Sequence, residues 1–235
     1  MLRALLVAWK AFCYALGTLV AVVVLLQLWF FAHIVYWSAV DPSSTAFMER
    51  RLEALRARDP RAQTRRQWAS YDRISAHLKR AVVAAEDAKF LDHEGFDWEA
   101  IQKAMAKNER RGRIVAGAST ISQQLAKNLF LSGERSWARK AQEAAITWML
   151  ERTLSKRRIL ELYLNVAEWG DGVFGAEAAA RYHFGIPAAA LGPEQAAWLA
   201  AILPSPRSYA RGRITPYLAG RVATILARMG AAQIP

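Results

Sequence analysis

An uncharged, apolar stretch near the N-terminus is the strongest constraint on how this chain folds. No charged residue occurs between Lys10 and Asp41, and Ala11 to Trp37 is almost wholly apolar. A helix needs about 20 apolar residues to cross the hydrocarbon core of a bilayer, and this stretch is longer than that. The sequence therefore predicts a single transmembrane helix over residues 11–37, preceded by a short N-terminal segment, residues 1–10.

The residues that flank this helix indicate its orientation. Arg3 and Lys10 favour a cytoplasmic N-terminus, although Arg50 and Arg51 follow the helix closely. Because a long domain crosses the membrane largely regardless of such charges, we expect residues 1–10 in the cytoplasm and the main domain outside it. The rival interpretation is a cleaved signal peptide, whose apolar region is normally about 7–15 residues and ends at a small-residue cleavage site. Neither property is evident here.

The overall charge narrows the choice of partner. The 235 residues carry a formal net charge of +12 and are 54% apolar, which suits one domain with a substantial core. A basic domain tethered to a membrane has anionic headgroups and pyrophosphates as natural partners. Nucleic acid is not expected, because the chain has a membrane anchor and lacks zinc-finger spacings and glycine-rich phosphate loops. The only cysteine, Cys13, lies in the apolar stretch, so no disulfide framework is expected.

Helical periodicity dominates the rest of the chain. Residues 38–75 are rich in Arg, Ala and Glu and are predicted to form a juxtamembrane helix or tether, and residues 76–235 to form the main domain. Apolar residues recur at steps of three and four from Ile74 to Ala85, which is typical of a buried helix ending near Glu86. Strand signals are sparse, so the predicted fold class is mainly α. Capping residues predict helix starts at Asp97, Thr120, Ser136, Ser155 and Thr215 and helix ends at Gly185 and Gly230.

Four dense polar clusters interrupt the helical pattern between residues 86 and 165. In order, they read Glu86-Asp87-x-x-Phe90-x-x-His93-x-Gly95, Gly117-x-Ser119-Thr120-Ile121-x-Gln123-Gln124-Leu125-x-Lys127-Asn128, Arg135-x-x-x-Arg139-Lys140-x-x-Glu143 and Lys156-x-x-Ile159-Leu160-x-x-Tyr163-Leu164-Asn165. They bring carboxylates, cations and carboxamides into a segment that otherwise has the composition of helix core. This combination favours a site for an anionic sugar donor.

These clusters, in this order, resemble the donor-site motifs of the peptidoglycan glycosyltransferases of glycosyltransferase family 51, over about Arg80 to Pro206. The resemblance implies a lysozyme-like, two-lobed domain whose smaller lobe associates with the membrane. It also implies polymerisation of glycan strands from lipid II, with β-1,4 linkages, inversion and release of undecaprenyl diphosphate. No Ser-x-x-Lys motif occurs in the sequence, so we expect a monofunctional enzyme without transpeptidase activity.

The same resemblance implies where the protein acts and with what. The membrane is the bacterial inner membrane, with the catalytic domain in the periplasm. The implied partners are lipid II, the growing lipid-linked glycan and other proteins of cell-wall synthesis or division. No organic cofactor is predicted. A divalent cation, Mg or Mn, is compatible with the donor diphosphate, although the sequence identifies no ligands for it.

The chemistry of this reaction explains the residue types. An acceptor hydroxyl is a poor nucleophile until a base takes its proton, whereas a diphosphate leaves well when cations neutralise its developing charge. Glu86 follows an apolar turn where burial would raise its pKa, so it is the predicted base, with Asp87 orienting it or a nearby cation. By resemblance, Glu143 is the second catalytic carboxylate and orders Arg139 and Lys140 on the donor side.

The predicted substrate contacts come mainly from the second and third clusters. Lys127 and Arg135 are expected to contact the diphosphate directly. Thr120, Gln123 and Gln124 lie at a helix start, where free N–H groups favour an anion, although Thr120 with Gln123 also fits a simple capping box. The predicted substrate-binding residues are Asp87, Ser119, Thr120, Gln123, Gln124, Lys127, Arg135, Arg139 and Lys140.

Other residues of the clusters are predicted to support the site. Phe90 packs, His93 is a hydrogen-bonded structural imidazole, and Lys156 and Asn165 brace the helix behind the site. A fifth family motif usually ends Tyr-Phe-Gly-Lys, whereas the equivalent residues here are His183-Phe184-Gly185-Ile186. We therefore assign no role to the side chains of His183 and Ile186.

Two other functions compete with this interpretation. A lysozyme-like hydrolase or lytic transglycosylase also uses a catalytic glutamate in a helical domain, but it must protonate a sugar leaving group and needs no cluster of Lys and Arg. A noncatalytic scaffold with a basic helical surface would explain Arg139 and Glu143 as an ordinary i,i+4 pair. It would leave the spacing of Glu86 and Glu143 unexplained.

Overall fold

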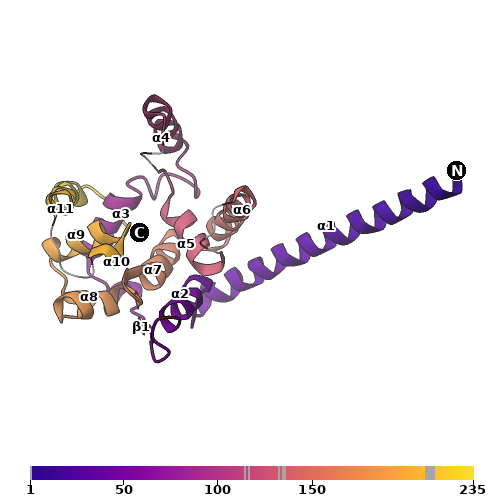
Figure 1. Cartoon of the computed structure of the whole chain (residues 1–235). Coiled ribbons are helices and arrows are strands. Elements are labelled where there is room, and N and C mark those ends of the chain that lie inside the picture. Colours follow the sequence, from indigo (N-terminus) through magenta and orange to yellow (C-terminus); the bar gives the residue numbers. More distant parts are fainter. Residues whose placement is uncertain (1, 114, 116, 132, 134–135, 210–214) are drawn as a thin grey trace.

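The structure, a computed structural model, describes residues 2–113, 115, 117–131, 133, 136–209 and 215–235. Its longest element is helix α1 (Leu2–Ala39), which extends away from the rest of the molecule (Figure 1). Residues Leu5–Ala39 are apolar and long enough to cross a membrane, and most of their side chains are exposed. The helix predicted over residues 11–37 is thus confirmed as a helix, and it continues beyond both predicted ends.

Two groups of helices build the domain. In the first group, α3 (Ala76–Glu86), α9 (Pro193–Ile202) and α11 (Pro216–Met229) pack against one another. In the second group, α5 (Ile121–Phe130) packs against both α6 (Trp137–Thr153) and α7 (Lys156–Val166). Figure 1 shows the second group nearer to α1 and the first group further from it. The prediction of a mainly α fold is confirmed.

Smaller elements complete the chain. Helix α4 (Trp98–Arg111) has no buried residue and stands apart from the other helices in Figure 1. Further helical segments are α8 (Ala176–Phe184), α10 (Pro206–Tyr209) and the short 3₁₀ helices η1 (Tyr71–Arg73) and η2 (Ala188–Ala190). A three-stranded sheet has the order β1-β3-β2, from β1 (Arg65–Arg66), β2 (Glu168–Gly170) and β3 (Val173–Phe174). Strand β1 runs parallel to β3, and β2 runs antiparallel to it.

The segment predicted as a juxtamembrane helix or tether, residues 38–75, packs with the domain. It forms helix α2 (Ala46–Arg56), whose N-terminus is capped by Thr45. Met48, Tyr71 and Ile74 are buried in the hydrophobic core. This segment therefore contributes to the same core as residues 76–235.

Most of the predicted helix boundaries are confirmed by their capping contacts. Asp97, Ser136, Ser155 and Thr215 each accept a hydrogen bond from a backbone N–H of the helix that follows. Gly185 ends α8 with a φ of 70°, a left-handed conformation that glycine adopts readily. Each such N-cap contributes about 1 kcal/mol to stability, so these residues help to fix where the site helices begin.

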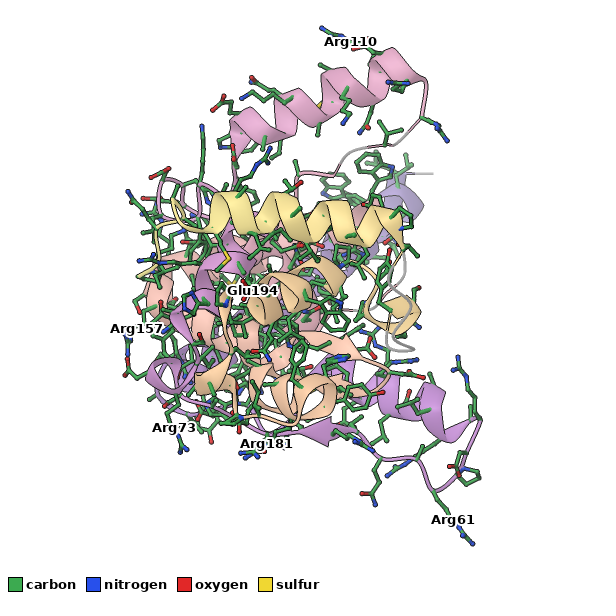
Figure 2. All side chains as sticks on the ribbon, turned by 90° about the vertical axis from the view of Figure 1, so that its left-hand side faces the viewer. Arg61, Arg73, Arg110, Arg157, Arg181 and Glu194 are labelled. Atoms are coloured by element: carbon green, nitrogen blue, oxygen red, sulfur yellow. The ribbon has the colours of Figure 1, made fainter. Side chains whose placement is uncertain are left out.

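The positive charge of the domain lies largely on its surface. The arginines labelled in Figure 2 are exposed and point outward at the margins of the molecule. They are Arg61, Arg73, Arg110, Arg157 and Arg181. By contrast, Lys127, Arg139 and Lys140 are only partly exposed.

Candidate active site

Glu86 lies at the end of a buried helix. Helix α3 starts at Ser75, which caps it, and buries Leu78, Val82 and Val83 in the core. Glu86 is the last residue of this helix, and only 12% of its side chain is exposed. The apolar stripe of α3 therefore carries a carboxylate to the edge of the core, as the sequence predicted.

Three polar side chains from other helices fix the Glu86 carboxylate. Gln124 of α5 donates from its Nε2 to Glu86 Oε2 at 2.9 Å, and Arg221 of α11 donates from Nη2 to Oε1 at 3.1 Å. The hydroxyl of Tyr163 donates to Gln124 Oε1 at 3.0 Å, which turns the amide nitrogen of Gln124 toward Glu86. The carboxylate is thus held between both groups of helices.

Burial raises the pKa of Glu86 above its ordinary value, because removal from water disfavours the charged form. The hydrogen bond from Gln124 and the positive charges of Arg221 and Lys127 oppose this shift, and the negative charge of Asp87 adds to it. A glutamate with a raised pKa is a better proton acceptor than an exposed one. This is the property that a general base requires.

Asp87 connects the end of α3 to the start of α5. Its Oδ2 accepts the backbone N–H of Ile121 at 3.0 Å, and its Oδ1 lies 2.8 Å from His93 Nε2. The Gly95 N–H donates to the other ring nitrogen of His93 at 3.1 Å, so Nε2 is the nitrogen that donates to Asp87. Only 2% of the Asp87 side chain is exposed. The structure therefore gives Asp87 a bracing role, and the predicted contact with substrate remains a prediction.

Thr120 and Gln123 form the predicted capping box of α5. The Gln123 N–H donates to Thr120 Oγ1 at 3.2 Å, and the Thr120 N–H donates to Gln123 Oε1 at 3.1 Å. The Thr120 hydroxyl in turn donates to the Gly95 carbonyl at 2.7 Å. Gly95 has a φ of 89°, and a Cβ there would come within 2.8 Å of Thr147, so only glycine fits this position. Thr120 and Gln123 position Gln124 rather than face the solvent.

Glu143 forms a second, different carboxylate site. It lies on α6 with 3% of its surface exposed, and its Oε2 accepts a hydrogen bond from Arg139 Nη1 at 2.7 Å. Its Oε1 accepts a hydrogen bond from Lys140 Nζ. The three residues therefore share one helix face, as their spacing predicted. The two ion pairs hold the side chains of Arg139 and Lys140 against the Glu143 carboxylate.

Lys127 is the cation next to this cluster. Burial lowers its pKa, and the positive charges of Arg139 and Lys140 lower it further, whereas Glu143 and Glu86 raise it. Its ammonium group forms no hydrogen bond with the part of the chain that the structure describes. Lys127 is partly buried, and a partly buried ammonium without a fixed partner among the described residues favours the arrival of an anion.

The predicted supporting residues brace the site from behind. Phe90 is completely buried, and the Lys156 ammonium lies 4.6 Å from the centre of its ring. Lys156 also donates to the His93 carbonyl at 2.6 Å and to Glu151 at 2.9 Å. The carboxamide of Asn165 pairs with both the N–H and the carbonyl of Ala69, each at 2.9 Å. These contacts are those expected of packing and bracing side chains, and the supporting roles of Phe90, His93, Lys156 and Asn165 stay predictions.

Two cavities flank the pair formed by Glu86 and Gln124. The larger, of about 830 Å³, is lined by Gln124 and Lys127 together with residues of α2 and of the 203–208 segment. The smaller, of about 310 Å³, is lined by Glu86, by the exposed residue Ser119 and by the start of α4. The carboxylate and the amide thus lie between two spaces, which suits a reaction that joins two substrates.

Three residues named in the sequence analysis take no part in the described contacts around Glu86 and Glu143. Arg135 lies outside the residues that the structure describes. His183 is half-buried, and its Nε2 lies 2.8 Å from the Trp169 carbonyl, which is an ordinary structural hydrogen bond. Ile186 packs against the core. The departures of His183 and Ile186 from the family pattern therefore lie in packing positions.

Sequence reasoning missed two residues that contact the Glu86 network. Arg221 lies far from all four clusters along the chain, and the only local signal is a charged residue between apolar residues of α11. Tyr163 belongs to the fourth cluster, where the neighbouring residues Leu160 and Leu164 indicate a position mostly in the core. It is indeed buried, and burial raises its pKa well above the ordinary value, but its hydroxyl also orients Gln124.

Comparisons with known proteins are consistent with this geometry. The profile of the family described as Transglycosylase matches residues 52–230. A biosynthetic peptidoglycan transglycosylase of Nitrosospira multiformis is 57% identical over 227 residues, which are 97% of each chain. The protein of the same name from Dechloromonas aromatica is 60% identical over 209 residues, 89% of this chain and 90% of the relative. That of Azoarcus sp. is 57% identical over 227 residues, 97% of this chain and 98% of the relative.

Proposed function

We infer a reaction for this chain, which belongs to the transglycosylase family and is a peptidoglycan glycosyltransferase. The domain of this family is lysozyme-like. We propose that the chain polymerises glycan strands from lipid II, forming β-1,4 linkages with inversion and releasing undecaprenyl diphosphate. The observation that carries the proposal is the difference between two carboxylates. Glu86 has a raised pKa and accepts hydrogen bonds from a neutral amide and a guanidinium, whereas Glu143 is paired with two cations.

In the proposed reaction Glu86 is the general base. The acceptor hydroxyl oxygen bonds to the anomeric carbon of the donor while its proton passes to the Glu86 carboxylate. Gln124 and Arg221 hold that carboxylate in place, so little reorganisation is needed when the proton arrives. One displacement inverts the α-linked donor to a β-linked product.

The cations serve the leaving group. The bond that breaks joins the anomeric carbon to the diphosphate oxygen, and both bonding electrons leave with the diphosphate. Lys127, Arg139 and Lys140 are positioned to neutralise that charge, with Arg135 as a further predicted contact. Because charge neutralisation replaces protonation, no general acid is required on this side.

The alternative of a glycan hydrolase is less well supported. A hydrolase needs an acid to protonate a sugar leaving oxygen, and usually a second carboxylate to act on water or the sugar. Glu143, the second carboxylate here, has both oxygens engaged by Arg139 and Lys140. That arrangement supports an anionic leaving group rather than a sugar alcohol.

The fit of a divalent cation at the donor diphosphate is poor. Within the described ranges, no three His, Cys, Asp or Glu side chains gather to hold a metal ion. The nearest carboxylate to the cation cluster, Glu143, would have to release Arg139 or Lys140 to become a ligand. We therefore derive no step through a metal, and a role for Mg or Mn remains a prediction.

We further propose the cellular arrangement. The apolar helix Leu5–Ala39 suits a membrane anchor, and we place its N-terminus in the cytoplasm, the anchor in the bacterial inner membrane and the catalytic domain in the periplasm. Other cell-wall synthesis or division proteins are proposed partners. Because no Ser-x-x-Lys motif is present, we propose no transpeptidase activity. Labelling of a cysteine placed at the exposed residue Glu194, with Cys13 replaced, tests the topology: protection from an impermeant reagent in whole spheroplasts would contradict it.

Purified lipid II tests the proposed reaction. Full-length protein in a lipid bilayer should convert lipid II into glycan polymer, and the released lipid product should be undecaprenyl diphosphate. The same preparation should release no muropeptides from isolated cell-wall sacculi. Release of muropeptides without polymer from lipid II would move the protein to the hydrolase class.

A further inference from the structure

The outer end of the anchor helix is packed onto the catalytic domain. Phe30 and Ile34 are buried, with 6% and 0% exposed, whereas most other apolar residues of α1 are exposed. The Phe30 ring lies 5.1 Å from that of Phe130 at the end of α5, and Trp37 lies 5.0 Å from Phe130 on another side. Helix α1 also packs against α6. The final turns of α1 are therefore part of the second helix group.

A reciprocal amide pair lies at one end of this contact. Gln27 Nε2 donates to Gln142 Oε1 at 2.9 Å, and Gln142 Nε2 donates to Gln27 Oε1 at 3.1 Å. Gln27 is the only carboxamide residue between Ala11 and Trp37. An amide at membrane depth needs a partner within the protein, because hydrocarbon offers none. The pair therefore selects one rotation of α1 about its own axis and one register along α6.

Arg158 of α7 holds the other end of the contact. Its Nε donates to the Trp37 carbonyl at 3.0 Å, and its Nη2 donates to the Val40 carbonyl at 3.1 Å and to Asp41 at 2.8 Å. A guanidinium at the C-terminal end of a helix also complements the helix dipole. Two polar attachments separated by a packed aromatic cluster define the direction in which α1 leaves the domain.

The helices that hold the anchor also carry the donor-side cations. Gln142 immediately precedes Glu143 on α6, and Phe130 lies three residues after Lys127 on α5. Trp137 and Trp148 of α6 are 91% and 57% exposed, a pattern typical of side chains at a membrane interface. The direction of α1 therefore determines how the donor side is presented to the bilayer.

We propose that Gln27 and Gln142 are positioning residues for the polymerisation reaction. Their amide pair locks α1 onto α6 and so sets the height and tilt of the site above the bilayer. The diphosphate of a membrane-bound donor lies at headgroup level and is then presented to Lys127, Arg139 and Lys140. This inference rests on the proposed function, because it requires a substrate whose depth is fixed by its lipid.

The test compares two settings for full-length protein carrying Gln27→Leu. In nanodiscs with undecaprenyl-linked lipid II, turnover should fall about three- to tenfold, the range of population change that one interhelical amide pair supports. In detergent with a short-chain lipid II analogue, whose depth is not fixed, turnover should match that of the unmodified protein. Leu28→Ala, a change at the adjacent exposed position, is the matched control and should leave both rates unchanged.

A second variant separates positioning from the cost of an unpaired amide. Gln27→Leu with Gln142→Leu leaves no amide unsatisfied, yet it also removes the lock, so its turnover in nanodiscs should remain low. Recovery to the unmodified rate would overturn the proposal, as would an equal loss in nanodiscs and in detergent. Thermal unfolding of each variant reports whether the domain stays folded. If the unmodified protein made no polymer in either setting, the proposed function would fail and this inference with it.

Discussion

Glu86 and Glu143 are both withdrawn from solvent, but their surroundings differ in kind. Glu86 accepts hydrogen bonds from a neutral amide, Gln124, and from one guanidinium, Arg221, at 2.9 and 3.1 Å. Glu143 is bound by two cations on its own helix, Arg139 and Lys140. Burial dominates at Glu86 and raises its pKa despite the nearby positive charge.

This difference in surroundings indicates that the two carboxylates have different functions, although the sequence motifs present both simply as glutamates. A carboxylate that accepts a hydrogen bond from a neutral amide, and whose own pKa is raised, is prepared to receive a proton. A carboxylate that binds two cations is prepared to hold those cations where negative charge develops. The comparison therefore supports the proposal that Glu86 is the base and that Glu143 organises the leaving-group side. Substitutions at these residues and at their partners test this proposal, and they should differ in how strongly they lower the polymerisation rate.

Glu86→Gln should have the largest effect. The amide keeps the size of the side chain but cannot accept the acceptor proton, so the polymerisation rate should fall about 10²–10⁴-fold. Polymer formed from lipid II measures the rate, and thermal unfolding should show little change. Near-normal turnover in a folded variant would remove Glu86 from the role of base.

Glu143→Gln should follow closely. Loss of the carboxylate frees Arg139 and Lys140 from their fixed positions, so transition-state stabilisation should drop by about 10²–10³ in rate. Lys127→Met, which removes the neighbouring cation, should give a loss of similar size. Both are measured as turnover per folded enzyme. If the two variants lost stability but retained turnover, Glu143 would be a structural ion-pair residue only.

Arg221→Met should shift the pH dependence more than the maximal rate. Arg221 lowers the pKa of Glu86, so its removal should raise that pKa further. As the proposed base, Glu86 would act in its deprotonated form, so the acidic limb of the kcat/KM profile should move to higher pH. At a pH within that limb the variant should be slower than the unmodified enzyme, and the gap should close as pH rises. A limb that stays in place would separate Arg221 from the base.

Tyr163→Phe should have the smallest effect of these variants. It removes one neutral hydrogen bond to Gln124 and leaves the ring in the core, a loss of about 0.5–1.5 kcal/mol, or roughly twofold to 13-fold in rate. Leu160→Ala, a core change on the same helix, is a control for packing. If the rate fell in proportion to the loss of stability, and to the same degree in both variants, Tyr163 would contribute only through its packing in the core.

Sequence reasoning succeeded where the signal was local. The capping box of Thr120 and Gln123, the shared face of Arg139 and Glu143 and the apolar stripe leading to Glu86 all depend on spacings of three or four residues. Such spacings follow from helix geometry alone. The mainly α fold was predictable for the same reason.

The rest depended on tertiary contacts. Arg221 reaches Glu86 from the last helix, and residue spacing contains no information about that approach. Strands of two or three residues are too short to show an alternating pattern. The segment around Arg51 has the composition of a tether, yet Arg51 is buried. Its Nε donates to the carboxylate of Glu168, which comes from a distant part of the chain, at 2.8 Å. A buried charge is tolerated only with such a partner.

Equilibrium binding of undecaprenyl diphosphate to Glu86→Gln and Glu143→Gln, measured side by side, tests the central comparison most directly. If Glu86 acts only as the base and Glu143 organises the cations, the Glu86 variant should bind this ligand as tightly as the unmodified enzyme, and the Glu143 variant should bind it more weakly. Equal loss of binding in both variants, or loss only in the Glu86 variant, would contradict the assignment of the two carboxylates.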